Sequence, residues 1–219
     1  MDNKKQVEIL SVVKSILESL LYAPDMIDVG RDIWKRLKRP SELGEPKTKN
    51  GIVGNTFYSG KYKFQISIPD DNWRFWEPTP QYIASLGTDY TLPNLDVPII
   101  ILSTNMIRLY RPIMFITVED VGTFTSIQEL AQLEKMSLET DGYLVDQENV
   151  KIQSRNNSAG IIATGGTYLQ RQIVSCVEMI YLRASKAFYI QAHYVPDDPE
   201  TPQMFGGMQD ILSSFKLIK

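Results

Sequence analysis

The chain has 219 residues, 43% of them hydrophobic, which is enough for one sizeable core with an appendage but not for two full domains. Its formal net charge is −3, so its overall field is too weak to favour a nucleic acid as partner. The single cysteine, Cys176, excludes an internal disulfide and a cysteine-based zinc cluster.

Residues 1–40 are predicted to form an N-terminal helical arm. Between residues 6 and 22, apolar side chains recur every three or four positions, with charged and small polar residues between them, which is typical of an amphipathic helix. These apolar side chains are Val7, Leu10, Val13, Leu17, Leu20 and Leu21. A second helix is predicted from Met26 until Pro40 stops it.

The apolar side chains of this arm are expected to be buried against another surface. We expect Leu10, Leu17 and Trp34 to lie in its contact surface. Three covers remain open: the chain's own domain, a second copy of the chain in a homo-oligomer, or another protein. A run of basic residues at the end of the second helix either complements the helix dipole or meets an acidic partner or a membrane surface. The run is Lys35, Arg36, Lys38 and Arg39.

No targeting segment is expected at the N-terminus. Lys14 and Glu18 interrupt its apolar residues and no small-residue cleavage site follows, so the sequence predicts neither a signal peptide nor a transmembrane span. A cytoplasmic location is the expectation that follows. Residues 41–54 contain Gly, Pro and scattered charge without periodicity, and they are predicted to be a linker.

The main domain is predicted to span residues 55–219, beginning with strands at 55–58 and 62–68. An aromatic loop then leads into a Pro-rich excursion. Aromatic side chains beside an arginine have the composition of an interface anchor, but loop aromatics also close small cores. The candidate partner-binding residues here are Trp73, Arg74, Phe75, Trp76 and Tyr82.

The second half of the domain is predicted to contain two central strands, a helix, an antiparallel meander and a final helix. Residues 97–104 and 112–119 are apolar on both faces, as in a covered sheet. Ser126 and Glu129 form a capping-box signature. The predicted meander strands are 143–153, 160–170, 172–182 and 187–195, and the last helix contains Met204, Phe205, Met208, Ile211, Leu212 and Phe215. These elements predict an α+β fold with helices packed on one antiparallel sheet.

The sequence gives little support for a catalytic role of either His193 or Cys176, the two candidate groups in the meander. His193, the only histidine, shares its side of a strand with Tyr189 and Gln191 and is expected to face outward. Cys176, between β-branched neighbours, is expected to be buried and unreactive. A hydrolase or small-ligand enzyme that uses His193 or the acidic loops remains the alternative to a binding protein.

Metal and nucleotide sites are not indicated either. Acidic pairs occur at 70–71, at 119–120 and around 197–200, with the last the first candidate for a cation, but each is also an ordinary turn and no EF-hand spacing occurs. Gly165 and Gly166 lack the spacing of a phosphate-binding loop and predict a β-bulge. We therefore expect no metal, no cofactor and no catalytic residue.

The order of these elements resembles the PsbP-like superfamily, which includes extrinsic photosystem II subunits, Ran-binding Mog-type proteins and DcrB-type lipoproteins. The likeness covers residues 55–219 and rests on the string YKFQISIPDDNW, with Tyr62, Phe64, Ile66, Pro69 and Trp73, and on the closing DILSSF. It implies an α/β/α sandwich without chemistry of its own, docked on a larger complex. The arm has no counterpart there, and the family's exported members carry a signal that is not seen here. The expected function is a non-enzymatic protein-binding or scaffold subunit, with a membrane-associated adaptor as a further alternative.

Overall fold

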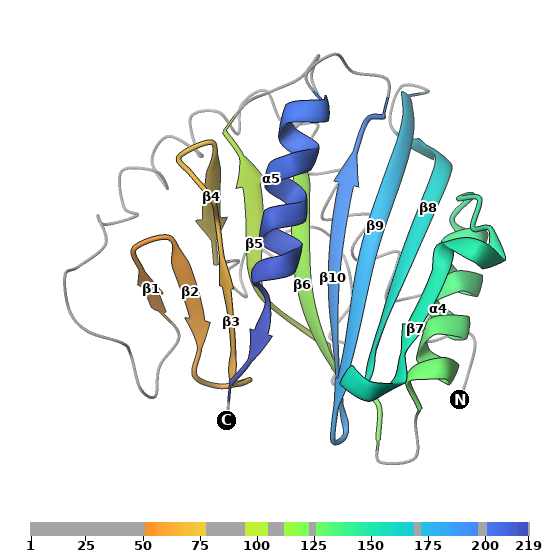
Figure 1. Cartoon of the computed structure of the whole chain (residues 1–219), viewed down its shortest axis with the longest axis horizontal. Coiled ribbons are helices and arrows are strands. Elements are labelled where there is room, and N and C mark those ends of the chain that lie inside the picture. Colours follow the sequence, from red (N-terminus) through yellow and green to blue (C-terminus); the bar gives the residue numbers. More distant parts are fainter. Residues whose placement is uncertain are drawn as a thin grey trace.

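Two antiparallel sheets and two α-helices make up the described part of the computed structural model, which covers residues 51–77, 95–104, 112–122, 126–168, 172–196 and 201–218 (Figure 1). The larger sheet has the order β4 (Trp73–Trp76), β5 (Leu95–Ser103), β6 (Ile113–Asp120), β10 (Lys186–Tyr194), β9 (Gln172–Arg183), β8 (Ser158–Tyr168) and β7 (Val150–Gln153). The smaller sheet has the order β1 (Gly51–Val53), β2 (Thr56–Ser59), β3 (Phe64–Ser67) and β11 (Lys216–Leu217). The fold is α+β, as predicted.

The two helices pack on opposite faces of the larger sheet. Along β10, Phe188, Ile190 and Ala192 belong to the core that contains the smaller sheet and α5 (Thr201–Ser214). Tyr189 points the other way, into the core beneath α4 (Ile127–Thr140). Because side chains alternate along a strand, one central strand serves both cores.

The capping box, the β-bulge and the antiparallel meander predicted from local sequence patterns are all present. Ser126 Oγ accepts a hydrogen bond from the Glu129 N–H at 3.2 Å, while Glu129 Oε2 accepts from the Ser126 N–H at 2.8 Å, which completes the capping box of α4. The register of β8 against β9 shifts between Ala163 and Gly166, and Gly165 has a φ of 72°, so the two glycines do form a bulge. The predicted meander β7 to β10 is antiparallel throughout.

The structure differs from the prediction in three places. The strands divide into two sheets rather than one, and the aromatic residues 73–76 form strand β4 rather than a loop. Strand β1 lies within residues 41–54, the predicted linker, because it pairs with β2 across a two-residue turn. The run 143–153 is also not one strand, since η1 (Gln147–Asn149) separates the bridge at Leu144 from β7, and a second short helix, η2 (Ser154–Asn156), follows.

Arg183, at the end of β9, joins the two sheets. Its guanidinium donates to the backbone carbonyls of Tyr62 at 2.9 Å, Ile218 at 2.7 Å and Lys63 at 3.4 Å. These acceptors belong to the turn before β3 and to the end of the chain after β11. The contact links residues 120 positions apart in the sequence, so local periodicity could not reveal it.

The paired glycines of α5 have opposite roles, which predicts opposite effects of alanine. A β-carbon on Gly207 would come within 2.6 Å of Trp73 Nε1, whereas a β-carbon on Gly206 would meet open space. Gly207→Ala should lower the free energy of unfolding by about 1–2 kcal/mol, because the buried indole cannot withdraw. Gly206→Ala should raise it by about 0.5–1 kcal/mol through helix propensity.

Denaturant unfolding of the two variants beside the wild type measures both effects. Each substitution adds one methyl group to the same turn of the same helix, so each is the control for the other. Equal shifts for both variants would show that Trp73 does not pack closely on α5.

Candidate functional site

The aromatic residues predicted to bind a partner divide between the core and the surface. Trp73 and Phe75 are 2% and 5% exposed and pack in the core with α5 and the smaller sheet, so neither is available to a partner. Arg74 and Trp76 lie on the other side of β4 and are only partly buried, and their role as binding residues stays a prediction. Tyr82, Leu10, Leu17 and Trp34 lie outside the described residues.

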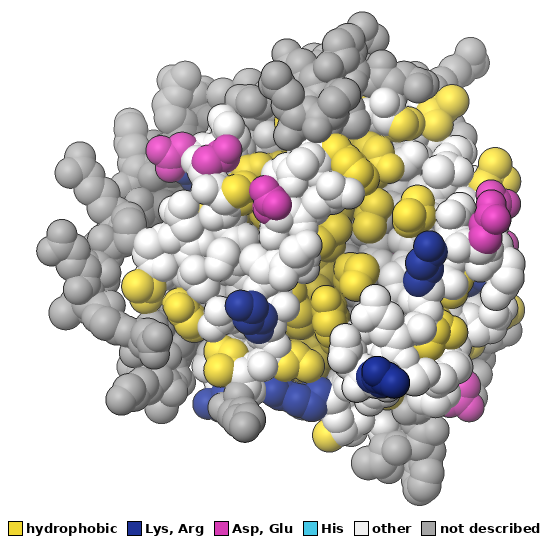
Figure 2. Space-filling view, viewed as in Figure 1, with side chains coloured by type: hydrophobic (Ala, Val, Ile, Leu, Met, Phe, Trp, Pro, Cys, Tyr) yellow, Lys and Arg dark blue, Asp and Glu magenta, His cyan; other side chains and the backbone are white. Residues whose placement is uncertain are grey.

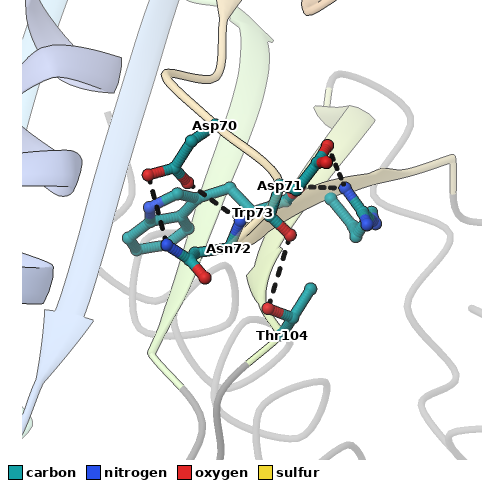
Figure 3. Close-up of polar contacts among 6 residues, drawn as sticks. Asp70, Asp71, Asn72, Trp73 and Thr104 are labelled. Atoms are coloured by element: carbon teal, nitrogen blue, oxygen red, sulfur yellow. Dashed lines mark hydrogen bonds and ion pairs between the residues drawn. The ribbon is translucent and has the colours of Figure 1, made fainter.

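The acidic pair at 70–71 builds the turn into β4 (Figure 3). Asp70 Oδ1 accepts from the Asn72 N–H at 2.8 Å, and its Oδ2 accepts from Asn72 Nδ2 at 3.2 Å. Asp71 Oδ1 accepts from the Arg74 guanidinium at 3.2 Å, and the Thr104 N–H donates to the Asn72 carbonyl at 2.7 Å. Both carboxylates therefore stabilise this turn from within, and a backbone hydrogen bond joins the turn to the residue after β5.

His193 is buried rather than outward-facing, which corrects the prediction. Its parity with Tyr189 and Gln191 is as predicted, but this face of β10 belongs to the interior, and His193 is only 6% exposed. The Tyr143 hydroxyl lies 3.4 Å from Nδ1, and Cys176 Sγ lies 3.8 Å from Nε2 across the strand pair. Tyr143 sits here because Gly166 leaves room for its ring: a β-carbon there would come within 2.4 Å of it.

Burial keeps this cysteine and histidine in protonation states that do not suit nucleophilic chemistry. Loss of solvent lowers the pKa of His193 to about 4 and raises the pKa of the Cys176 thiol well above its usual value. At neutral pH the pair is therefore a neutral imidazole beside a protonated thiol, rather than the thiolate that attacks a substrate. Cys176 is buried as predicted.

Two glutamates share the same interior layer. Glu178 on β9 and Glu134 on α4 are 0% and 9% exposed, and Gln191 Nε2 donates to Glu178 Oε1 at 3.0 Å and to Glu134 Oε1 at 3.4 Å. Desolvation raises the pKa of Glu134 to about 7, with Glu119 and Asp141 adding repulsion. Desolvation, and then the charge of Glu134, raises the pKa of Glu178 well above its usual value. The pair thus retains a proton at pH values where exposed glutamates are ionised.

The buried acids do not form a metal centre. No cluster of three or more His, Cys, Asp or Glu side chains suitable for a metal ion occurs within the described ranges. Glu119 accepts a hydrogen bond from the Tyr189 hydroxyl at 3.2 Å, and Asp120 pairs with Lys186 at 3.2 Å on the surface. The loop 197–200, the first candidate for a cation, lies outside the described residues.

An apolar surface lies on the α5 side of the larger sheet, over the strands that α5 does not cover. Ile162 on β8 and Ile173 on β9 are 41% and 52% exposed, and Val177 and Met179 are partly buried beside them. Figure 2 shows hydrophobic side chains in a strip beside α5 on this side of the molecule. We call this surface the open face and define it by Lys151, Ile162, Ile173, Val177 and Met179.

Strand register explains how the open face is assembled. Lys151, Gly160 and Met179 are cross-strand neighbours on β7, β8 and β9, and Ile162 is paired with Val177. Gly160 has no side chain to project from the open face, and Met179 packs closely over this position. A β-carbon on Gly160 would lie 3.2 Å from Met179 Sδ. Two ring pairs involving α5 and the residue after it, Tyr194 with Phe205 and Tyr181 with Phe215, border the face on one side.

The sequence does contain a signal for the open face. Strand β9 has apolar residues on both sides: Cys176, Ile180 and Leu182 belong to the core beneath α4, while Ile173, Val177, Met179 and Tyr181 lie on the other side. Such a strand normally has packing on both faces. In the described part of the chain, α4 packs on one of these faces, while on the other Val177, Met179 and Tyr181 are only partly buried against the core that contains α5. The sequence predicted the strands. Only the positions of the described helices show which side of β9 they leave partly exposed.

Comparisons with known proteins give similarity at the level of solved structures only. No protein-family model matches the sequence, and neither does any curated protein. The chain is similar to cyanobacterial PsbP from Synechocystis, with a TM-score of 0.48 and 8% identity over 83% of this chain and 99% of that one. It is also similar to LpqN of Mycobacterium tuberculosis, a protein involved in cell envelope biogenesis, with a TM-score of 0.47 and 12% identity over 83% and 90%.

A third similar structure is a protein from Bacteroides thetaiotaomicron, with a TM-score of 0.47 and 8% identity over 76% of this chain. The chain spans 49% of the length of that protein. Identities and TM-scores of this size do not assign a function. Neither α4 nor α5 has the length and apolarity of a membrane span, and these are the only α-helices in the ranges described.

Proposed function

We propose that this chain is a non-enzymatic domain that binds a protein through its open face and so docks onto a larger assembly. The observation that carries the proposal is the exposure of Ile162 on β8 and of Ile173 near the start of β9, on the side of the sheet where Val177 and Met179 are only partly buried. Contiguous apolar surface beside polar residues is typical of an interaction site. The groups best suited to chemistry, His193 and Cys176, are buried and held in unreactive protonation states.

An amphipathic helix is the ligand that fits this surface. A helix is about 10 Å wide and covers about two strands spaced by about 4.8 Å. Strands β8 and β9 present that width next to α5, so an added helix would lie alongside α5 in the same layer. Lys151 at the outer edge favours a helix with an acidic flank. The partner is therefore a protein that presents an apolar helical stripe.

Charge placed on the open face should weaken this binding. The test uses purified chain as bait in native lysate, in three forms: wild type, Ile162→Glu with Ile173→Glu, and Met136→Glu as control. Met136 is 45% exposed on α4, on the opposite face of the sheet, so the control adds charge at matched exposure. Proteins retained by wild type and control but not by the double variant are then purified, and their affinity for all three forms is measured.

We expect the double variant to lose at least about tenfold in affinity for the purified partner, because its charges would be desolvated against an apolar stripe. Thermal unfolding of each form confirms that the variants fold. Equal affinity of all three forms, or no specific protein retained by the wild type, would contradict the proposal.

A further inference from the structure

We infer that residues 6–22 of the same chain pack on the open face as a helix, and that a partner must displace them to bind. The inference rests on the proposed function in that both ligands use the open face. It deepens that function by adding a regulatory step, since the surface would be covered until a competing helix arrives.

The first argument is that two apolar surfaces of one chain each lack a cover. Strand β9 is built for packing on both sides, yet among the described elements its second side meets only the edge of the α5 region, and Ile173 stays 52% exposed. Residues 6–22 carry an apolar stripe that includes Leu10 and Leu17 and has no reason to remain in water. Packing one on the other covers both.

The second argument is dimensional. A helix of residues 6–22 is about 25 Å long, whereas the 12 residues of β9 extend over about 40 Å, so the helix fits within the length of the strand. Helices pack about 8–10 Å apart, which is the width of the two strands left beside α5. The segment also carries Glu8 and Glu18 against a single Lys14, which suits an edge that holds Lys151.

The third argument favours the chain's own segment over a second copy. Residues 23–50 connect the segment to β1 and, even with the predicted helix at 26–39, can span about 65 Å, beyond the size of a domain of this length, which is on the order of 40 Å. A tether that reaches its site gives an effective concentration in the millimolar range, above that of a second chain in solution. The open face alone, with five defining residues, is also small beside the 20–30 residues a side of a standard dimer interface.

Thiol labelling of the full-length chain tests this inference. Cys176 is buried and its thiol has a raised pKa, so the native background is slow, and Ile162→Cys supplies a reporter on the open face. The reporter is placed in the wild-type background, in Leu10→Glu with Leu17→Glu, and in Ser15→Glu with Ser19→Glu. The last pair adds the same charge on the polar side of the predicted helix. Met136→Cys on α4 reports any global change.

We expect the Leu10 and Leu17 variant to label Ile162→Cys at least about tenfold faster than wild type, with the serine variant and Met136→Cys unchanged. Light scattering should find a monomer in every case. Equal labelling rates in all three backgrounds would overturn the inference, and so would protection that appears only in a dimer.

The failures of the two proposals are distinguishable. If labelling is unaffected but Ile162→Glu with Ile173→Glu still loses its partner, only the cover by residues 6–22 is wrong. If labelling changes as expected but the partner binds the charged face normally, only the proposed function is wrong. Where both hold, Leu10→Glu with Leu17→Glu should retain more partner than wild type.

Discussion

Glu134→Gln should become progressively more stabilising, relative to wild type, as the pH rises from about 4.5 to about 8, by about 3 kcal/mol in total. The folded pKa of Glu134 is raised to about 7 by burial, so the folded state binds more protons than the unfolded state in this window. Stability contributed by the protonated form is therefore fully present below the unfolded pKa and is lost as the pH rises through the folded pKa. A shift of about 2.5 pKa units corresponds to about 3 kcal/mol.

The measurement is the difference in free energy of unfolding between Glu134→Gln and wild type at several pH values. A matched control is Glu139→Gln, on the exposed side of the same helix. The control measures the effect of removing an exposed carboxylate from the same helix. A pH-independent difference for Glu134→Gln would mean that the Glu134–Glu178 pair does not hold its proton.

Acid should destabilise the protein through His193 with the opposite sign. The folded pKa of His193 is lowered to about 4 by burial, so the unfolded state binds more protons between about pH 6.5 and about pH 4. The stability contributed by the neutral imidazole is present above the unfolded pKa and is lost as the pH falls, by about 3 kcal/mol. His193→Gln removes the titration and should flatten this part of the profile.

The comparison again uses the difference between variant and wild type, because Glu134 and His193 act against each other between about pH 4.5 and about pH 6.5. His193→Gln should be least costly at low pH and most costly at neutral pH. At neutral pH the cost is the loss of the imidazole's ring contacts with Phe115 and Tyr143 and of its polar contacts with the Tyr143 hydroxyl and Cys176. A cost that stays constant from about pH 4 to about pH 7 would show that the imidazole is accessible to solvent.

Local signals predicted most of the elements because those signals act within a few residues. The Ser126 and Glu129 capping box, the Gly165 and Gly166 bulge and the apolar face of α5 each depend on neighbours in sequence. The different roles of Gly206 and Gly207 could not be predicted in this way, because both glycines lie in the same turn of the same helix. Only the position of Trp73 distinguishes them, and Trp73 lies on a strand more than 130 residues earlier in the chain.

The candidate site was much less predictable. Sequence patterns showed that His193 shares a side with Tyr189 and Gln191, but not whether that side is inside. They also predicted β9 as a meander strand, but not how much of each of its faces the described helices would cover. The aromatic residues around Trp73 and Phe75 were predicted either to anchor a partner or to close the core, and only the pairing of β4 with β5 shows that these two are buried.

The sequence by itself determined the α+β class, the meander, the helix boundaries set by capping, and an N-terminal segment with an unmatched apolar stripe, since these follow from periodicity and turn chemistry within short windows. The tertiary structure decided which glutamates meet inside the core, which aromatic residues are buried, and that the described elements leave one apolar side of β9 partly exposed. Those outcomes depend on how distant strands are ordered and where the two helices lie, and neither is encoded in any local stretch of the chain.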